Sequence, residues 1–269
     1  MYSYKVVICG CTKNSEQYIE KHLELLYGLG SIFEKCNIIV YENDSEDETK
    51  EKLKSFKRTH TSFEFISENG IANKLKHRPL IIAHSRNTLM KYIDERYNNY
   101  DMIIMVDLDK VICKFNINVI TNTLDHYKYD SWDVLTGNCD GKYYDIWALR
   151  ICQDMWDIRI HQSLWKNGPI DYDCWLPETG DKNPQYFVYD NQVHIPTDYP
   201  LIPVNSAFNG IGIYKMKAVK NCRYSAIDDK GIITCEHVSF HKKIKELNNG
   251  RIFICPKLLI YNEDHYKLL

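Results

Sequence analysis

The sequence lacks a surplus of charge of either sign. Its 34 lysines and arginines stand against 36 aspartates and glutamates, which gives a formal net charge of −2. Sequence-independent nucleic-acid binding needs a broad basic surface for the phosphates. We therefore expect no nucleic acid among the partners of this protein.

Long apolar runs and paired cysteines are also missing. No run approaches the roughly 18 apolar residues of a membrane span, and residues 1–5 have no charged region followed by a long apolar one, so we expect neither a membrane span nor a signal peptide. The ten cysteines include no Cys-x-x-Cys pair, which argues against a zinc ribbon or a dithiol redox site. We predict a cytoplasmic protein without a membrane span, whose cysteines are mostly reduced and buried. Because their number is even, disulfides in a secreted protein are the alternative.

The first 110 residues contain an alternation of strand-like apolar runs and helical patterns. Two helix starts are marked by capping-box patterns, Asn14 with Gln17 and Ser45 with Glu48. Such alternation predicts an α/β fold with a parallel sheet. Strands are predicted at residues 5–10, 37–41, 62–67 and 102–106, and a further helix at 79–97.

Periodicity weakens after Asp109 and returns near the end of the chain. Residues 140–205 are irregular and contain four of the five tryptophans. A strand at 208–214, a helix at 238–247 and a strand pair at 251–261 then follow. Without an internal repeat or a linker, the chain is predicted to be a single domain.

Polar residues follow three of the predicted strands, at 12–14, 42–44 and 107–109. In open α/β sheets, ligands bind beyond the carboxyl ends of the strands. Asp107 and Asp109 follow a fully apolar strand, and paired carboxylates suit Mg²⁺ or Mn²⁺ carrying a diphosphate. A second Asp-x-Asp, Asp171 with Asp173, has no strand before it and is predicted to be a solvated cap.

Several motifs together resemble the GT-A fold glycosyltransferases. They are Glu42-Asn43-Asp44-Ser45 with Thr49, Ser85-Arg86-Asn87, Asp107-Leu108-Asp109, and the stretches 208–214 (FNGIGIY) and 235–241 (CEHVSFH). The stretch 144–150 (YDIWALR) is similar to a motif of the capsule-associated α-1,3-mannosyltransferase group of fungi. The resemblance implies one Rossmann-like GT-A domain over 1–269 with a mixed central sheet. Residues 1–110 would bind the nucleotide sugar and residues 111–269 the acceptor.

This resemblance implies a metal-dependent transfer from a nucleotide-diphosphate sugar to a glycan or other hydroxyl acceptor. Mn²⁺ or Mg²⁺ would be held by Asp107, Asp109 and His265, with His237 and His241, which are four residues apart, as alternative ligands. Carboxylates would accept hydrogen bonds from the base and ribose, and Arg86 would face the diphosphate or the sugar. The donor-binding residues are then Thr12, Asn14, Glu42, Asp44, Arg86, Asp107 and Leu108.

Acceptor and catalytic roles are expected in the second half. If residues 145–147 form a strand, Asp145 and Trp147 share a face, which would place a hydrogen-bond acceptor beside an aromatic wall. The clustered tryptophans favour a sugar platform, although Trp147 could be simply core. Glu236 opens a predicted helix and would act as general base or orient the acceptor, with Asp145 as a second catalytic carboxylate. The remaining acceptor-side residues are Arg150, Asn209 and Gly210.

Two other functions are open at this stage. A haloacid-dehalogenase-type phosphohydrolase would use Asp107 as nucleophile, with Val134–Thr136 and Asp228-Asp229 as further motifs. Its nucleophile strand usually lies near the N-terminus, whereas three strand-helix units precede Asp107 here. The other alternative is a non-catalytic carbohydrate-binding protein.

Overall fold

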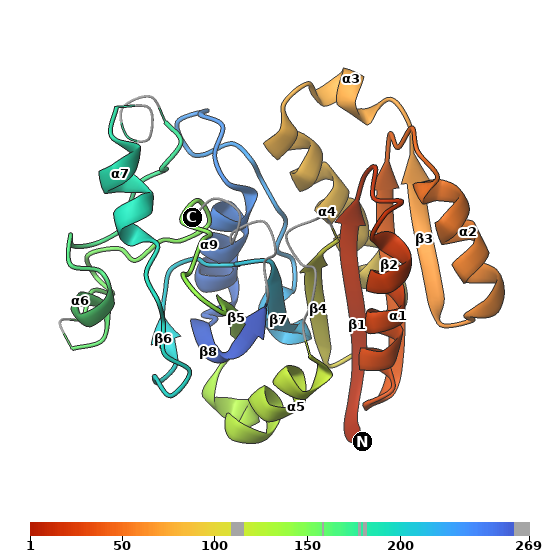
Figure 1. The fold of residues 1–269 in the computed structure, drawn as a ribbon, viewed down its shortest axis with the longest axis horizontal. Helices are drawn as coiled ribbons and strands as arrows, with labels where there is room; N and C mark the ends of the chain where they lie inside the picture. Colours follow the sequence, from red (N-terminus) through yellow and green to blue (C-terminus); the bar gives the residue numbers. More distant parts are fainter. Residues whose placement is uncertain (109–115, 158, 177–178, 180–181, 261–269) are drawn as a thin grey trace.

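A mixed sheet runs through the centre of the computed structural model, which describes residues 1–108, 116–157, 159–176, 179 and 182–260 (Figure 1). The predicted ligands Asp109 and His265 lie outside the described residues. The strand order is β3-β2-β1-β4-β7-β5-β8-β6. The strands are β1 (Tyr2–Thr12), β2 (Phe33–Asn43), β3 (Phe63–Glu68), β4 (Met102–Asp107), β5 (Val134–Cys139), β6 (Ile202–Pro203), β7 (Ile211–Lys215) and β8 (Ile252–Ile260).

Helices cover both faces of this sheet. They are α1 (Ile19–Gly30), α2 (Thr49–Thr59), α3 (Ile71–Leu75), α4 (Arg78–Arg96), α5 (Ile117–His126), α6 (His161–Leu164), α7 (Pro184–Phe187), α8 (Met216–Val219) and α9 (Glu236–Asn248), with 3-10 turns η1 (Tyr129–Ser131) and η2 (Tyr189–Asn191). Side chains alternate along a strand, so Val6 and Ile8 pack toward α1 and α2, and Val7 and Cys9 pack toward α4 and α9. The apolar strands are therefore buried on both faces.

Strand directions divide the sheet in two. The strands β3, β2, β1 and β4 are mutually parallel, as strand-helix-strand units require. By contrast, β7 is antiparallel to β4 and to β5, and β6 is antiparallel to β8. The predicted α/β class and mixed central sheet are confirmed.

Most predicted elements are present, with shifted ends. The four N-terminal strands are found, and the helix predicted at 79–97 is α4. The strand pair predicted at 251–261 is wrong. Its residues instead form the one strand β8, because β5 on one side and β6 on the other supply its hydrogen-bonding partners.

Both predicted capping boxes are wrong. The helix α1 starts at Ile19 and α2 at Thr49, and the residue before each makes no side-chain cap. The Asn14 side chain instead accepts a hydrogen bond from the backbone N–H of Glu46 at 2.9 Å, and Ser45 Oγ accepts one from the N–H of Asn14 at 3.0 Å. These polar side chains therefore join the loops after β1 and β2.

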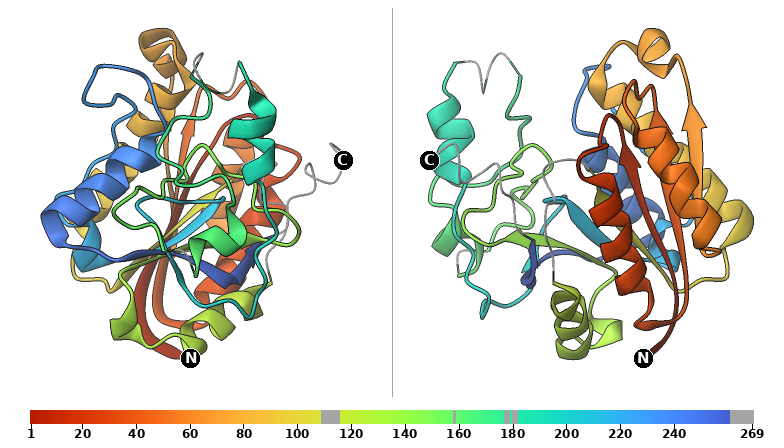
Figure 2. Two further views of the ribbon diagram at one scale, coloured as in Figure 1. Left: turned by 90° about the vertical axis from the view of Figure 1, so that its left-hand side faces the viewer. Right: turned by 45° about the vertical axis from the view of Figure 1, so that its right-hand side comes forward.

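The described residues between 140 and 205 form an irregular region with short helices at one end of the molecule, opposite the N-terminal strands (Figure 2). That its tryptophans form a sugar platform stays a prediction, and two of the clustered rings do not lie on a surface. Trp165 and the neighbouring Trp132 are buried in the core. Large aromatic rings supply buried apolar area where regular structure is scarce.

The cysteine prediction holds where the structure can test it. Nine described cysteines are free, and six of these are buried. In the part of the chain that the structure describes, no helix combines the length and apolar character needed to cross a membrane.

Candidate active site

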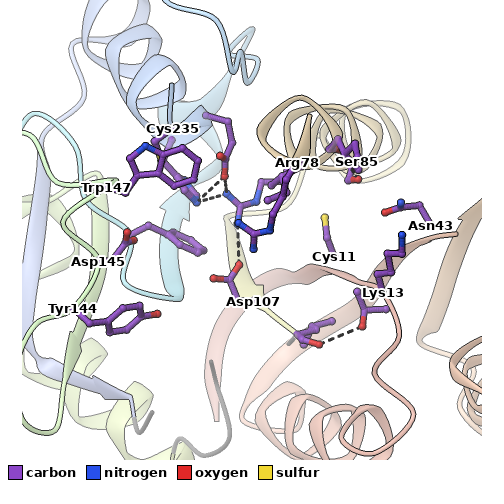
Figure 3. Close-up of a pocket in the computed structure, with 18 residues that line it drawn as sticks. Cys11, Lys13, Asn43, Arg78, Ser85, Asp107, Tyr144, Asp145, Trp147 and Cys235 are labelled. Atoms are coloured by element: carbon purple, nitrogen blue, oxygen red, sulfur yellow. Dashed lines mark hydrogen bonds and ion pairs between the residues drawn. The ribbon is translucent and has the colours of Figure 1, made fainter. Parts of the chain in front are cut away.

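A cavity of about 530 Å³ opens at the carboxyl ends of β1 and β4 (Figure 3). It brings together side chains from strand ends, from α4, from the start of α9 and from the stretch after β5. Seven predicted site residues line it: Thr12, Arg86, Asp107, Leu108, Asp145, Trp147 and Glu236.

Strand ends hold the floor of the cavity. Cys11 on β1 pairs with Asp107 on β4, and Thr12 Oγ1 donates to the carbonyl of Leu108 at 3.2 Å. A Cβ added to Gly10 would lie 2.3 Å from the carbonyl oxygen of Val106. Glycine at this position therefore allows the close approach that places Asp107 and Leu108 at the floor.

Arg86 projects from α4 into the cavity and is only 5% exposed. Its Nη2 donates to Asp107 Oδ1 at 2.8 Å, and its Nη1 contacts Glu236 Oε1 and His237 Nε2. Burial opposes the charged form, but the carboxylates of Glu236 and Asp107 raise the pKa of Arg86 above its ordinary value. The guanidinium therefore links β4 to α9.

Glu236 is the first residue of α9, where the helix dipole favours a carboxylate. This confirms the predicted helix start. Its Oε1 is held by Arg86, whereas the buried Oε2 has no hydrogen-bond partner among the described residues. A buried acceptor without a partner is costly unless a ligand satisfies it.

Asp145 directly precedes a turn at 146–148, and residues 145–147 do not form a strand. Its Oδ1 accepts from the N–H of Ala148 at 3.2 Å, and its Oδ2 accepts from the N–H of Asn209 at 2.9 Å. Burial raises the pKa of the Asp145 carboxyl. Asp145 and Trp147 therefore do not share a strand face, but both side chains line the same cavity.

Trp147 is fixed by Asp173, a residue that the sequence analysis misinterpreted. The indole Nε1 of Trp147 donates to both Asp173 oxygens, at 2.9 and 3.0 Å. Thr234 Oγ1 and the N–H of Trp175 also donate to this carboxylate, at 2.8 and 3.0 Å. Asp173 is therefore a buried hub and not a solvated cap.

Three acceptor-side residues lie behind the cavity wall. Arg150 is buried and donates to the carbonyls of Trp147 and Leu149, at 2.9 and 2.7 Å. Asn209 and Gly210 form a left-handed turn, and the Gly210 carbonyl accepts from the N–H of Asp107 at 2.9 Å. This turn therefore supports Asp107 through the backbone.

Glu42 and Asp44 do not line this cavity, and neither does Asn14. Glu42 is fully buried and accepts from the N–H of Ser45 at 2.8 Å and from Ser67 Oγ at 2.5 Å. Asp44 accepts from the N–H groups of Gly70 and Ala72. Both carboxylates hold the loop around Asn43, whose side chain does line the cavity.

Sequence reasoning named Lys13 only within the polar stretch 12–14 and missed Arg78, another cationic residue of the cavity wall. Lys13 follows Thr12, and Arg78 opens α4. Neither forms an ion pair within the described residues. Both lie near predicted site positions, and their charge and place at an element boundary were the available signals. Asn43 and Ser85 also line this side (Figure 3).

The alternative histidine ligands make other contacts, since His237 lines the cavity but contacts Arg86 there, and His241 does not line it. His241 contacts Ser206 Oγ at 2.9 Å and the Tyr214 hydroxyl at 3.1 Å, and burial lowers its pKa to about 3. Burial and the nearby Arg86 also hold the pKa of His237 well below its usual range. Within the described parts of the chain, no group of three or more His, Cys, Asp or Glu side chains is arranged to hold a metal.

Similarity to solved structures defines the class of fold. The mannosyltransferase PcManGT from Pyrobaculum calidifontis, in complex with GDP-Man and Mn²⁺, matches 97% of this chain and 57% of its own, with a TM-score of 0.57 and 13% identity. TarS 1-349 from S. aureus matches 98% of this chain and 63% of its own, with a TM-score of 0.53 and 18% identity. Its complex with UDP gives the same coverage, a TM-score of 0.52 and 17% identity. The fold is that of the GT-A glycosyltransferases.

The family follows from the sequence match. Residues 5–243 match the family described as Cryptococcal mannosyltransferase 1, and the chain belongs to this family of glycosyltransferases. No curated protein matches the chain. The chain spans about three fifths of the two solved proteins, 57% and 63% of their lengths. Membership of this family excludes the phosphohydrolase alternative. The acidic motif which that alternative required, Asp228-Asp229, also does not line the cavity around Asp107.

Proposed function

We propose that this protein transfers a sugar from a nucleoside-diphosphate sugar to a hydroxyl of a glycan or another acceptor. The observation that carries the proposal is the convergence of Arg86, Asp107, Asp145 and Glu236 on one cavity at the carboxyl ends of β1 and β4. Membership of the mannosyltransferase family supports the same reaction class. PcManGT was solved with GDP-Man and TarS with UDP, which supports a nucleotide-sugar donor.

The donor lies against the N-terminal wall in this proposal. Lys13, Arg78 and Arg86 offer positive charge to a diphosphate. Thr12, Asn43 and Leu108 line the same wall and contact the nucleoside or the sugar. Asn14, Glu42 and Asp44 then act through the loop that they hold, as positioning residues.

A divalent cation fits the floor of this cavity. The Asp107 side chain is 28% exposed, and it presents carboxylate oxygen, the ligand type that Mg²⁺ and Mn²⁺ prefer. Mg²⁺ is usually bound by one or two carboxylates together with substrate phosphates, so a complete cage of side chains is not required. The sequence adds Asp109 and His265 as proposed ligands. When bound, the cation neutralises the charge of the departing diphosphate.

The acceptor meets the donor at Asp145. The acceptor oxygen forms a bond to the anomeric carbon, the bond from that carbon to the diphosphate oxygen breaks, and the acceptor proton passes to Asp145. A carboxyl whose pKa is raised by burial suits this role as general base. Glu236 accepts a hydrogen bond from a sugar hydroxyl through Oε2, which has no partner among the described residues. Arg150, Asn209 and Gly210 position the segment that carries Asp145 and Trp147.

Thermal unfolding with nucleotides tests the donor site. GDP, UDP and CDP, each with Mn²⁺, are added singly, and the nucleotide sugars of the best one are assayed for hydrolysis without acceptor. A ligand at 100 times its Kd stabilises a protein by about 2.7 kcal/mol, so we expect a clear rise in Tm for at least one of them. Adenosine with Mn²⁺ is the control without a diphosphate. If none of the three nucleotides shifts Tm, the proposal is wrong.

A further inference from the structure

A second and larger cavity, of about 1080 Å³, adjoins the candidate active site. Tyr144, Asp145 and Trp147 line both cavities, so the two meet at the proposed general base. The larger one continues from there past Trp175 to η2. A pocket for a single drug-sized ligand has a volume of about 300–1,000 Å³, so one sugar ring would not fill this one.

Two exposed aromatic rings line the second cavity. Trp175 is 56% exposed and Tyr189 is 52% exposed, although aromatic side chains usually contribute to a core. Their flat apolar faces offer contact area at a low cost in conformational entropy. Trp175 is also held in place, because its backbone N–H donates to Asp173, the carboxylate that fixes Trp147. The ring of Trp147 and the backbone of Trp175 are thus held by the same carboxylate.

Polar groups in the second cavity match hydroxyls. Gln185 donates through its amide nitrogen to Asp190, and Gln192 donates to the carbonyl of Tyr144. Among the described residues, no hydrogen bond to either amide oxygen is found, so each can accept one from a ligand hydroxyl. The acidic side chains that line this cavity outnumber the basic ones. Asp140, Asp145 and Asp190 line it, together with Lys142. A phosphorylated or otherwise anionic chain would be repelled.

We infer that the second cavity is the binding site for the acceptor, and that the acceptor is a neutral oligosaccharide of more than one sugar unit. The inference rests on the proposed function for the direction of transfer. Trp175 is the platform for a sugar ring remote from the reaction, and the terminal unit reaches Asp145 where the cavities meet. Affinity should therefore increase with the length of the saccharide.

Calorimetric titration of the full chain tests the inference with mannotriose, maltotriose and cellotriose, their monosaccharides, and the anionic hyaluronan tetrasaccharide. We expect at least one neutral trisaccharide to bind at least about tenfold more tightly than its monosaccharide, and more tightly than the anionic chain. Trp175→Ala should weaken that binding by about tenfold or more, and Trp175→Phe should restore part of it. The variants should keep wild-type affinity for the nucleotide with Mn²⁺.

Tyr186→Ala is the matched control, because Tyr186 is 41% exposed on the adjacent α7 but does not line the cavity. It should bind the trisaccharide like the wild type. The inference is overturned if no neutral trisaccharide binds, if the anionic chain binds best, or if Trp175→Ala binds like the wild type. Saccharide binding without any nucleotide binding would instead refute the proposed function and leave this site in place.

Discussion

The two walls of the candidate active site are held by different kinds of interaction. On the N-terminal wall, the backbone ladder between β1 and β4 fixes Asp107, and one side-chain bond from Thr12 fixes Leu108. On the opposite wall, Trp147 lies in a turn that depends on the buried side chains of Asp173 and Arg150. At Asp107 and Leu108 the first wall is therefore held mainly by the strand ladder, whereas the second wall depends on a side-chain network.

This difference determines how each wall should respond to mutation. Removing a side chain from the end of a strand leaves the ladder intact, so function can be lost while the fold survives. Removing a member of a buried polar network leaves its partners unsatisfied, so stability and position are lost together. The predictions below separate these two outcomes.

The largest effect is expected from Asp107→Asn on the N-terminal wall. Loss of this charge should reduce sugar transfer by about 100-fold or more, a magnitude typical of removing one electrostatic group at a reaction centre. The Tm should change little, because Arg86 keeps Glu236 as an ion-pair partner. Transfer assays and thermal unfolding measure the two effects.

Asp229→Asn is the control for this variant, since that carboxylate is exposed and pairs only with Lys242 among the described residues. A large fall in the Tm of Asp107→Asn would show that the N-terminal wall also depends on side-chain charge. Full transfer activity would remove Asp107 from the donor site.

Asp173→Ala should have the opposite profile on the other wall. It leaves the buried Arg150 guanidinium without the carboxylate that lies 3.8 Å away, and breaking a buried pair costs about 3–5 kcal/mol. We expect Tm to fall by about 2–4 °C for each kcal/mol lost, and the KM for acceptor to rise more than the KM for donor. Asp173→Asn, which keeps one acceptor oxygen, should lose less.

Asp171→Asn provides the comparison within the same Asp-x-Asp, because Asp171 is exposed. Its Tm should match that of the wild type. If Asp173→Ala unfolds at the wild-type temperature, the side-chain network is not what holds the second wall.

The smallest effect concerns acid sensitivity, which should arise mainly from α9 behind the second wall. His237 and His241 have lowered pKa values in the folded protein, chiefly through burial, but regain an ordinary value near 6.5 on unfolding. Below that pH the unfolded chain binds more protons, so stability present at pH 7 is lost as the pH falls toward 3. Each histidine contributes a slope of up to about 1.4 kcal/mol per pH unit.

Denaturant unfolding between pH 7 and pH 5 measures this slope. His241→Gln should reduce it by about 1.4 kcal/mol per pH unit at most, whatever its effect at pH 7. His126→Gln, at an exposed histidine of α5, should leave the slope unchanged. An unchanged slope in His241→Gln would mean that this histidine is protonated in the folded protein.

The same contrast explains what could be predicted from sequence. Apolar strands ending in polar residues mark the N-terminal wall, because burial on both faces leaves a readable pattern, and Asp107 was found in this way. Asp173 carries no such local mark, since its partners Trp147 and Thr234 are 26 and 61 residues away. The capping boxes failed for a related reason, because Asn14 and Ser45 bind each other's loops and not their own helices.

The long helix α4 carries two of the cationic side chains that face the cavity. Arg78 is its first residue and Arg86 follows eight residues later, which separates them by about 12 Å along the axis. Because α4 is one continuous helix, any sliding of α4 moves the backbone positions of both arginines by the same amount. The backbone spacing of the two arginines is therefore set by helical geometry, and the side-chain rotamers then set the distance between the two guanidinium groups.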